Sequence, residues 1–225
     1  MRVGLLSDVH ANLVALEAVL DDMPPVDEVV CAGDVVGYNP WPGDCVDRVR
    51  AVAAATVEGN HDRNVGTPGR YRANEMAYAG LQLARTELSP DQRRWLDDLP
   101  DREVLLDGRL LLVHSHPDPG RAGRYVYPAE FPALAPYLDD HDVLVLGHTH
   151  VQHEERVDDT LVVNPGSVGQ PRDGDPRAAY AVLDVVDDGV TVELRRVEYD
   201  VDRVQAAVEA ADLPERTGTR LAAGR

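Results

Sequence analysis

The chain has 225 residues, and its 22 Lys and Arg against 40 Asp and Glu give a formal net charge of −18. This length allows one sizeable buried core, and the proportions of 44% hydrophobic and 28% charged residues argue against disorder, collagen-like repeats and disulfide scaffolds. The negative charge also argues against non-specific binding to nucleic acids, whose backbone carries the same sign.

The charged residues are strongly biased, since every basic residue is Arg and 27 Asp outnumber 13 Glu. This bias is typical of proteins from a very salty cytoplasm, where carboxylates keep the protein surface hydrated and salt screens the repulsion between them. High-GC coding also favours Arg over Lys. Residues 1–6 are too short for the apolar region of a signal peptide, and no uncharged stretch reaches the length of a membrane span. We therefore expect a halophilic, cytoplasmic protein without a membrane partner.

Short apolar or β-branched runs alternate with helix-like segments, which is typical of an α/β layered domain. Apolar residues at helical spacing predict a helix over 11–22. After residue 150 the runs are joined by short turns such as 187–189, which favours antiparallel hairpins. The predicted strands are 3–6, 27–32, 54–57, 109–113, 142–146, 160–163, 178–184 and 190–197.

Residues 67–100 differ from this pattern and are predicted to form a helical insertion. An apolar stripe predicts a helix over 73–87, and Ser89, Pro90 and Gln92 form the capping box that starts another. A further helix is expected over 201–211, followed by a flexible tail over 213–225. We therefore predict a single domain over 1–212 that contains the insertion.

A His, Asp or Asn follows each of five predicted strands. In open α/β sheets ligands bind at the carboxyl ends of the strands, so that these side chains are expected to form one functional site. In chain order the residues are Asp8 and His10, then Asp34, then Asn60, His61 and Asp62, then His114 and His116, and finally His148 and His150.

This set of residues is suited to divalent metal ions. Asp, His and Asn without Cys suit Mn, Fe, Co, Ni or Zn. Seven candidate ligands exceed what one ion needs, so we expect two ions with Asp34 as the bridge. The positive charge of two divalent ions exceeds the negative charge of two carboxylates, so the loaded site would select a compact anion such as a phosphate ester. The candidate ligands are Asp8, His10, Asp34, Asn60, His114, His148 and His150.

The spacing of these residues resembles the five motifs of the calcineurin-like metallophosphoesterase superfamily, and more narrowly its small, cap-less prokaryotic phosphodiesterases. The motifs are Asp8-Val9-His10, Gly33-Asp34, Gly59-Asn60-His61-Asp62, His114 and Gly147-His148-Thr149-His150. Residues 164–172 are similar to a further segment of this branch. The resemblance implies an α/β fold, a four-layer sandwich of two mixed β-sheets flanked by helices.

The resemblance also implies roles for individual residues. One metal would take Asp8, His10, Asp34 and His150, and the other Asp34, Asn60, His114 and His148. His61 would not be a ligand but would protonate the leaving oxygen as a general acid. Where protein phosphatases of the superfamily carry an Asp that orients this His, the chain has Gly37, so Asp62 becomes the candidate for that task.

Three further residues are candidates for binding substrate. The guanidinium groups of Arg172 and Arg63 suit phosphate oxygens, and His116 lies two residues beyond a candidate ligand. The alternatives are that the arginines pair with surface Asp residues and that His116 has no functional role. Residues 67–100 begin only a few positions after His61, so we expect this segment to overhang the site and select the substrate.

The predicted function is that of a dinuclear metal-dependent phosphoesterase. A metal-activated hydroxide would attack a phosphodiester or small phosphomonoester in line, with His61 as general acid. We expect two divalent ions, Mn first, with Fe, Zn, Ni or Co as alternatives. Rival functions are a phosphatase for proteins or dinucleoside polyphosphates, and a non-catalytic scaffold such as a eukaryotic trafficking subunit that resembles this family. The oligomeric state is left open, including a homo-oligomer.

Overall fold

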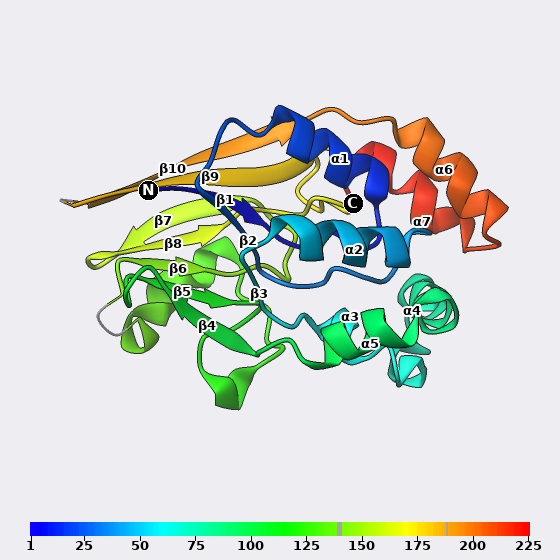
Figure 1. The fold of residues 1–225 in the computed structure, drawn as a ribbon, viewed down its shortest axis with the longest axis horizontal. Coiled ribbons are helices and arrows are strands. Elements are labelled where there is room, and N and C mark those ends of the chain that lie inside the picture. The colour runs from blue at the N-terminus through cyan, green and yellow to red at the C-terminus, as the bar shows by residue number, and fades with distance from the viewer. Residues whose placement is uncertain (139–140, 188) are drawn as a thin grey trace.

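The structure is a computed structural model that describes residues 1–138, 141–187 and 189–225. Its strands form two five-stranded sheets that are stacked face to face (Figure 1). The first sheet has the order β10-β9-β1-β2-β3. Strands β1, β2 and β3 are parallel to one another, β9 is antiparallel to β1, and β10 is antiparallel to β9. Its strands are β1 (Arg2–Leu6), β2 (Glu28–Cys31), β3 (Ala55–Thr56), β9 (Ala178–Val186) and β10 (Gly189–Val197).

The second sheet has the order β4-β5-β6-β8-β7, with three parallel strands in the middle and an antiparallel strand at each edge. Its strands are β4 (Arg102–Leu105), β5 (Leu110–Val113), β6 (Val143–Val145), β7 (His153–Val157) and β8 (Thr160–Asn164). The two edge strands were not predicted. β4 and β7 contain charged residues that interrupt any apolar run, as is common at exposed sheet edges.

Alternating side chains build the layers. Leu110 and Leu112 of β5 pack between the two sheets, whereas Leu111 and Val113 pack outward against Phe131. Phe131 belongs to the 3₁₀ segment η3 (Pro128–Tyr137), which covers the outer face of the second sheet. The fold is therefore the expected sandwich of two mixed sheets flanked by helical layers.

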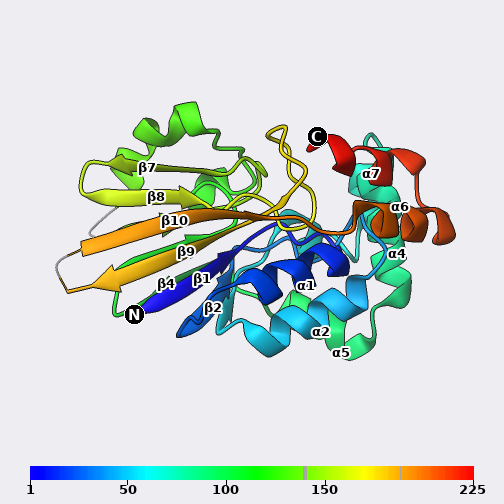
Figure 2. The ribbon, with the colours of Figure 1, turned by 90° about the horizontal axis from the view of Figure 1, so that it is seen from above.

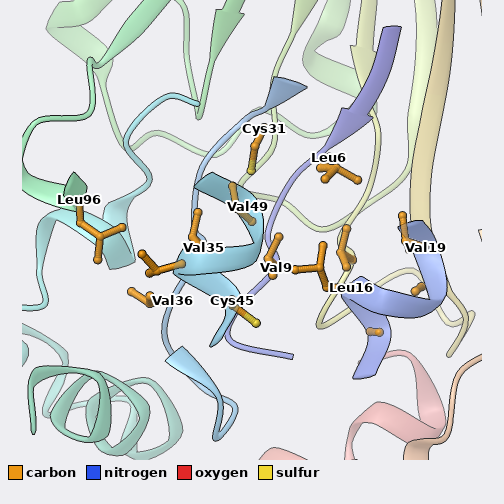
Figure 3. Close-up of a cluster of buried hydrophobic side chains, with 14 of the residues drawn as sticks. Leu6, Val9, Leu16, Val19, Cys31, Val35, Val36, Cys45, Val49 and Leu96 are labelled. Carbon is orange, nitrogen blue, oxygen red and sulfur yellow. The ribbon is translucent and has the colours of Figure 1, made fainter. Parts of the chain in front are cut away.

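The outer face of the first sheet is covered by α1 (Leu13–Asp22) and α2 (Pro42–Val52). Figure 3 shows Leu16 of α1 and Val49 of α2 pointing into the apolar cluster beside Leu6 of β1. α2 was not predicted, because its apolar residues are separated by Asp and Arg. These helices hold the loops that follow β1 and β2.

The helical insertion contains η1 (Pro68–Tyr71), α4 (Glu75–Glu87) and α5 (Pro90–Asp97), after the short α3 (Asn60–Arg63). The capping box of α5 is confirmed, since the Gln92 amide donates to Ser89 Oγ at 3.2 Å and the Ser89 amide to Gln92 Oε1 at 2.9 Å. α4 packs tightly against the loop after β2, because a Cβ on Gly80 would lie 2.1 Å from the backbone nitrogen of Tyr38.

The carboxyl-terminal segment differs from the expected flexible tail. After α6 (Val201–Ala210), residues 213–225 form α7 (Glu215–Thr219) and η4 (Leu221–Ala223). Leu213 and Leu221 are buried in a cluster with Val204 and Val208 of α6. These apolar contacts explain the helix, and they were invisible to a pattern search because the segment is too short to show a stripe. Among the described residues, no helix is long and apolar enough to cross a membrane.

Candidate metal centre

The candidate ligands follow β1, β2, β5 and β6, with Asn60 at the start of α3, and the fold brings them to one edge of the two sheets. Five of them adopt left-handed backbone conformations that are uncommon for residues other than Gly. Such strain is typical of functional sites, where it turns a side chain back toward the ligand. The φ values are 52° at Asp8, 48° at His10, 53° at Asp34, 69° at His148 and 59° at His150.

Asp8, His10 and His150 form the first ligand group. The Nε2 atoms of His10 and His150 lie 3.2 Å apart, and His150 Nε2 lies 3.3 Å from Asp8 Oδ1. Asp8 Oδ2 accepts hydrogen bonds from the Ser7 hydroxyl at 2.7 Å and the His148 amide at 2.9 Å, whereas the buried Oδ1 has no partner among the described residues. An unpaired buried carboxylate oxygen is costly, so this group fits a cation.

Asp34, Asn60, His114 and His148 form the second ligand group. His114 Nε2 lies 3.1 Å from Asn60 Oδ1 and 3.5 Å from Asp34 Oδ2. The ligand atoms of Asp34, His114 and His148 all lie within 4.8 Å of one another. Asp34 Oδ2 is also 3.6 Å from His10 Nε2 of the first ligand group. A single carboxylate oxygen therefore lies between the two groups.

The hydrogen bonds of the imidazoles select the nitrogen that faces the site. The Nδ1 atoms of His10, His114 and His150 lie 3.1, 2.7 and 2.6 Å from backbone carbonyl oxygens. In the neutral imidazole, a proton on Nδ1 leaves the Nε2 lone pair free for a metal, as is usual for metal-binding His. In His148 the two ring nitrogens exchange these roles, because Nε2 is the atom that lies 3.1 Å from a backbone carbonyl oxygen, that of Gly123.

The two groups differ in their electrostatics. In the first, burial lowers the pKa values of His10 and His150 far below the usual range and raises the pKa of Asp8 to about 6. In the second, burial opposes protonation of His114, yet the Asp34 carboxylate raises its pKa to about 10. Burial alone would raise the pKa of Asp34, but His114, His61 and His10 together lower it well below its usual value.

His61 lies beside both groups but makes different contacts. Its amide donates to Asp34 Oδ1 at 2.7 Å, and its ring packs against Tyr38 and Tyr71 with centroid distances of 4.8 and 5.0 Å. The buried Nδ1 has no hydrogen-bond partner among the described residues, and a Cβ on Gly37 would lie 2.3 Å from it. The ring is therefore held by aromatic packing over a Gly that leaves room for it.

Asp62 does not orient His61 as expected. Its carboxylate accepts hydrogen bonds from the amides of Val36 at 3.1 Å and Gly59 at 3.0 Å. It thereby ties the loop after β2 to the start of α3, so its effect on His61 runs through the backbone. Burial, followed by the charge of Asp34, raises the pKa of Asp62 to about 7.

The three candidate substrate residues lie in different surroundings. Arg172 donates from one nitrogen to Gln170 Oε1 at 2.7 Å and to the Tyr38 hydroxyl at 3.2 Å. Arg63 forms ion pairs with Glu58 and Asp101. His116 Nδ1 accepts from the Asp118 amide at 3.0 Å. Arg63 and His116 line a surface pocket that reaches the second ligand group at Asn60 and His114.

Two tyrosines and a serine lie beside the ligands, and the tyrosines were not identified from the sequence. Tyr125 stacks on His148 with a centroid distance of 4.0 Å and an interplanar angle of 14°. The Tyr71 hydroxyl, from the insertion, accepts from Asn60 Nδ2 at 2.5 Å. Ser167 Oγ donates to the Asp8 carbonyl at 2.7 Å. The tyrosines follow no strand-end pattern, whereas Ser167 belongs to the segment 164–172 that the sequence does single out.

Comparisons with known proteins identify the family of the chain. Residues 1–188 match the calcineurin-like phosphoesterase superfamily domain, so the chain belongs to this superfamily. It is a metal-dependent hydrolase of phosphate esters.

Three relatives illustrate the similarity. A metallophosphoesterase from Sphaerobacter thermophilus is 39% identical, with full coverage of both chains and a TM-score of 0.86. An uncharacterized protein of Methanocaldococcus jannaschii is 31% identical in an alignment of 247 positions, gaps included, which covers 99% of this chain and 98% of its own. The phosphodiesterase YfcE of Escherichia coli K12 is 30% identical over 190 residues, covering 82% of this chain and 88% of its own.

Proposed function

We propose that this chain hydrolyses phosphodiesters or small phosphomonoesters with two divalent ions, of which Mn is our first candidate. Asp8, His10, Asp34 and His150 would hold one ion, and Asp34, Asn60, His114 and His148 the other. The observation that carries the proposal is the position of Asp34 Oδ2, which lies 3.6 Å from His10 Nε2 and 3.5 Å from His114 Nε2. One oxygen can thus serve both groups.

The bound ions would polarise the phosphoryl oxygens and lower the pKa of water so that it can attack phosphorus. The chain supplies the remaining functions. Asp8 and Asp34 contribute only two negative charges, so the loaded site favours an anionic ester. His61 is the candidate proton donor to the leaving oxygen, and Tyr38 and Tyr71 hold its ring in place.

The phosphodiesterase activity in the name of YfcE favours a diester as the substrate. A scaffold role is disfavoured. His10, Asp34 and His61 form a third set that overlaps the two ligand groups, and in each of the three sets the potential ligand atoms lie within 4.8 Å of one another. A protein without catalysis has no need to keep such sets at strained, buried positions. Phosphatase activity on proteins or dinucleoside polyphosphates is the alternative function within the same superfamily.

The direct test combines elemental analysis with a substrate panel. Purified protein loaded with Mn should contain two ions per chain and hydrolyse bis-p-nitrophenyl phosphate, p-nitrophenyl phosphate or both, and a chelator should abolish turnover. The assay is run at low and at multimolar salt, because the acid-rich composition predicts adaptation to salt. A folded protein that binds no metal and turns over neither ester contradicts the proposal.

The role proposed for His61 makes a separate prediction. His61→Ala should retain both ions and lose about 10²- to 10⁴-fold in kcat, the usual contribution of a general acid. The loss should be smaller for esters whose leaving group is a weak base, since these need less protonation. His153→Ala is the matched control, because His153 is partly exposed on β7 and belongs to no group of potential ligands among the described residues. Full activity of His61→Ala would exclude the role.

A further inference from the structure

We propose that Tyr125 and Tyr127 form an aromatic platform beside the metal centre, and that a flat ring of the substrate stacks on this platform. The proposal rests on the proposed phosphoesterase function. It narrows the substrate class to phosphate esters that carry a flat ring such as a nucleobase, in contrast to esters of simple alcohols or sugars.

The segment between β5 and η3 turns the two tyrosines toward solvent. Val126 lies between them in the chain and is 2% exposed, whereas Tyr125 is 43% and Tyr127 is 48% exposed. Val126 belongs to the same buried cluster as Phe131 of η3. Figure 2 shows η3 as green helical turns beside β7. Because Val126 is anchored in the core, the residues on either side of it face outward.

Hydrogen bonds hold this segment at both ends. The Gly123 amide donates to Ser115 Oγ at 2.7 Å, and the Gly123 carbonyl lies 3.1 Å from His148 Nε2. At the other end the Tyr127 amide donates to Glu130 Oε2 at 3.1 Å. The backbone that carries the tyrosines is therefore fixed before any ligand binds, which lowers the entropic cost of binding.

The two tyrosine rings continue a stack that begins at a candidate metal ligand. The ring of Tyr125 lies on the ring of His148, with centroids 4.0 Å apart and an interplanar angle of 14°. The ring of Tyr127 is nearly parallel to that of Tyr125, at 5.9 Å and 13°. His148 in turn contacts the ring of His114 at 5.0 Å. A ring that joins this stack can therefore carry a phosphate to the ions on a short linker.

Exposed aromatic surface is rare in this chain. Only 5% of its residues are aromatic. Among the large hydrophobic side chains that are exposed in the described part of the chain, only Tyr125 and Tyr127 are aromatic. An exposed apolar patch at a site marks a binding surface. Two rings are too small for a stable protein interface, but they match the size of one nucleobase, which stacks well on an aromatic side chain.

The charges of the same segment are compensated. Arg124 pairs with Glu130 at 2.8 Å, and Arg121 lies 3.6 Å from Asp118. These arginines are therefore engaged with carboxylates rather than free for a second anion. The platform is suited to an uncharged ring, while the ions would hold the phosphate. The proposed substrate thus has a neutral flat part and an anionic part.

The first experiment measures binding without turnover. It uses phosphonate analogues of adenosine monophosphate and of ribose 5-phosphate, in which a methylene group replaces the ester oxygen. Each is titrated calorimetrically into Mn-loaded protein. The adenosine analogue should bind about tenfold more tightly or better, as expected for one base stacked on an aromatic ring. Equal affinities, or no measurable binding of either analogue, overturn the proposal.

Variants of the platform test its two rings. Tyr127→Leu should reduce the ratio of the two affinities by about fivefold or more, whereas Tyr127→Phe keeps the ring and should keep the ratio. Tyr125→Leu should lose at least as much, and its metal content is measured in parallel because Tyr125 stacks on a candidate ligand.

The matched control is Tyr78→Leu, which removes a tyrosine ring from α4. Its affinity ratio should equal that of the wild type. An unchanged ratio in Tyr127→Leu, or an equal loss in Tyr78→Leu, overturns the proposal.

The second experiment measures turnover of thymidine 5′-(p-nitrophenyl phosphate) and of the same ester of 1,2-dideoxyribose, which lacks the base. The wild type should favour the thymidine ester about tenfold in kcat/KM, and Tyr127→Leu should lose this preference through KM. Turnover of both esters with equal kcat/KM contradicts the platform alone. Lack of turnover of both, with the affinity ratio of the analogues intact, contradicts the phosphoesterase function alone.

A second copy of the chain is the other occupant to test. Light scattering after size-exclusion chromatography gives the molar mass of the wild type and of Tyr127→Leu. The same mass for both, together with a reduced affinity ratio in the variant, supports the platform. A lower mass of the variant with an unchanged ratio would make the tyrosines an interface between copies and overturn the proposal.

Discussion

The first and second ligand groups of the candidate metal centre meet at Asp34, which belongs to the second group and lies beside His10 of the first, but they differ in how they hold protons. Asp8 and His10 are completely buried, and burial keeps the imidazoles of the first group neutral by lowering their pKa values. The second group borders a surface pocket, and there Asp34 raises the pKa of His114 to about 10. The first group is thus ready to accept a cation at neutral pH, whereas the second has to release a proton first.

The largest expected effect comes from removing the residue that joins the groups. Asp34→Ala should lose metal from both groups and reduce kcat by more than about 10³-fold, since loss of an outer partner of a metal ligand alone costs about 10- to 100-fold. Metal content by elemental analysis and turnover of the ester panel are the measurements. Asp44→Ala, an acidic residue in the first turn of α2, is the control for a change of charge. Retention of two ions by Asp34→Ala would contradict the bridging position.

A pair of single substitutions should separate the groups. His150→Ala removes a ligand of the first group and His148→Ala one of the second, so each variant should contain about one ion instead of two. Turnover should fall by about 10²-fold or more in both, because two ions act together on one phosphoryl group. If either variant keeps two ions, or if one loses both, the division into two groups is wrong.

The difference in protonation predicts a difference in pH dependence. In metal-free protein His114, with a pKa of about 10, is protonated at pH 7, so that metal binding by the second group must displace its proton. Affinity of this group should rise about tenfold per pH unit between pH 7 and 9. The first group should change little in that window, because its imidazoles are neutral and the pKa of Asp8 is about 6.

Calorimetric titration of the single-site variants checks this, with His150→Ala reporting the second group and His148→Ala the first. Equal pH slopes in the two variants would show that the groups do not differ in protonation. Below pH 6 the first group should also weaken, because Asp8 then takes up a proton and loses the charge that attracts the cation.

The smallest expected effect lies outside both groups. Ser89→Ala removes the side-chain acceptor of the α5 capping box and should lower the free energy of unfolding by about 1 kcal/mol. Urea denaturation measures the change. Metal content should be unchanged in the same protein, so this variant separates loss of stability from loss of metal. A lower metal content would mean that the insertion supports the ligand groups more directly than its contacts through Tyr71 indicate.

The sequence by itself determined the class of the protein and the type of its site. Metal chemistry demands particular residue types, and a β-sheet presents them at the ends of its strands, so that Asp8, Asp34 and His114 could be recognised along the chain. The central strands could be predicted for a related reason, since a buried strand requires a run of apolar residues. The edge strands β4 and β7 contain no such apolar run, and neither does the short α7, so their sequences contained no signal.

Only the tertiary structure decided what surrounds the ligands. Tyr38 and Arg172 are 134 positions apart in the chain and nevertheless share a hydrogen bond. Asp62 accepts hydrogen bonds from backbone amides instead of orienting His61. These contacts arise from the packing of separate loops and helices, which depends on shape and distance in the folded chain. No local pattern of residues encodes them.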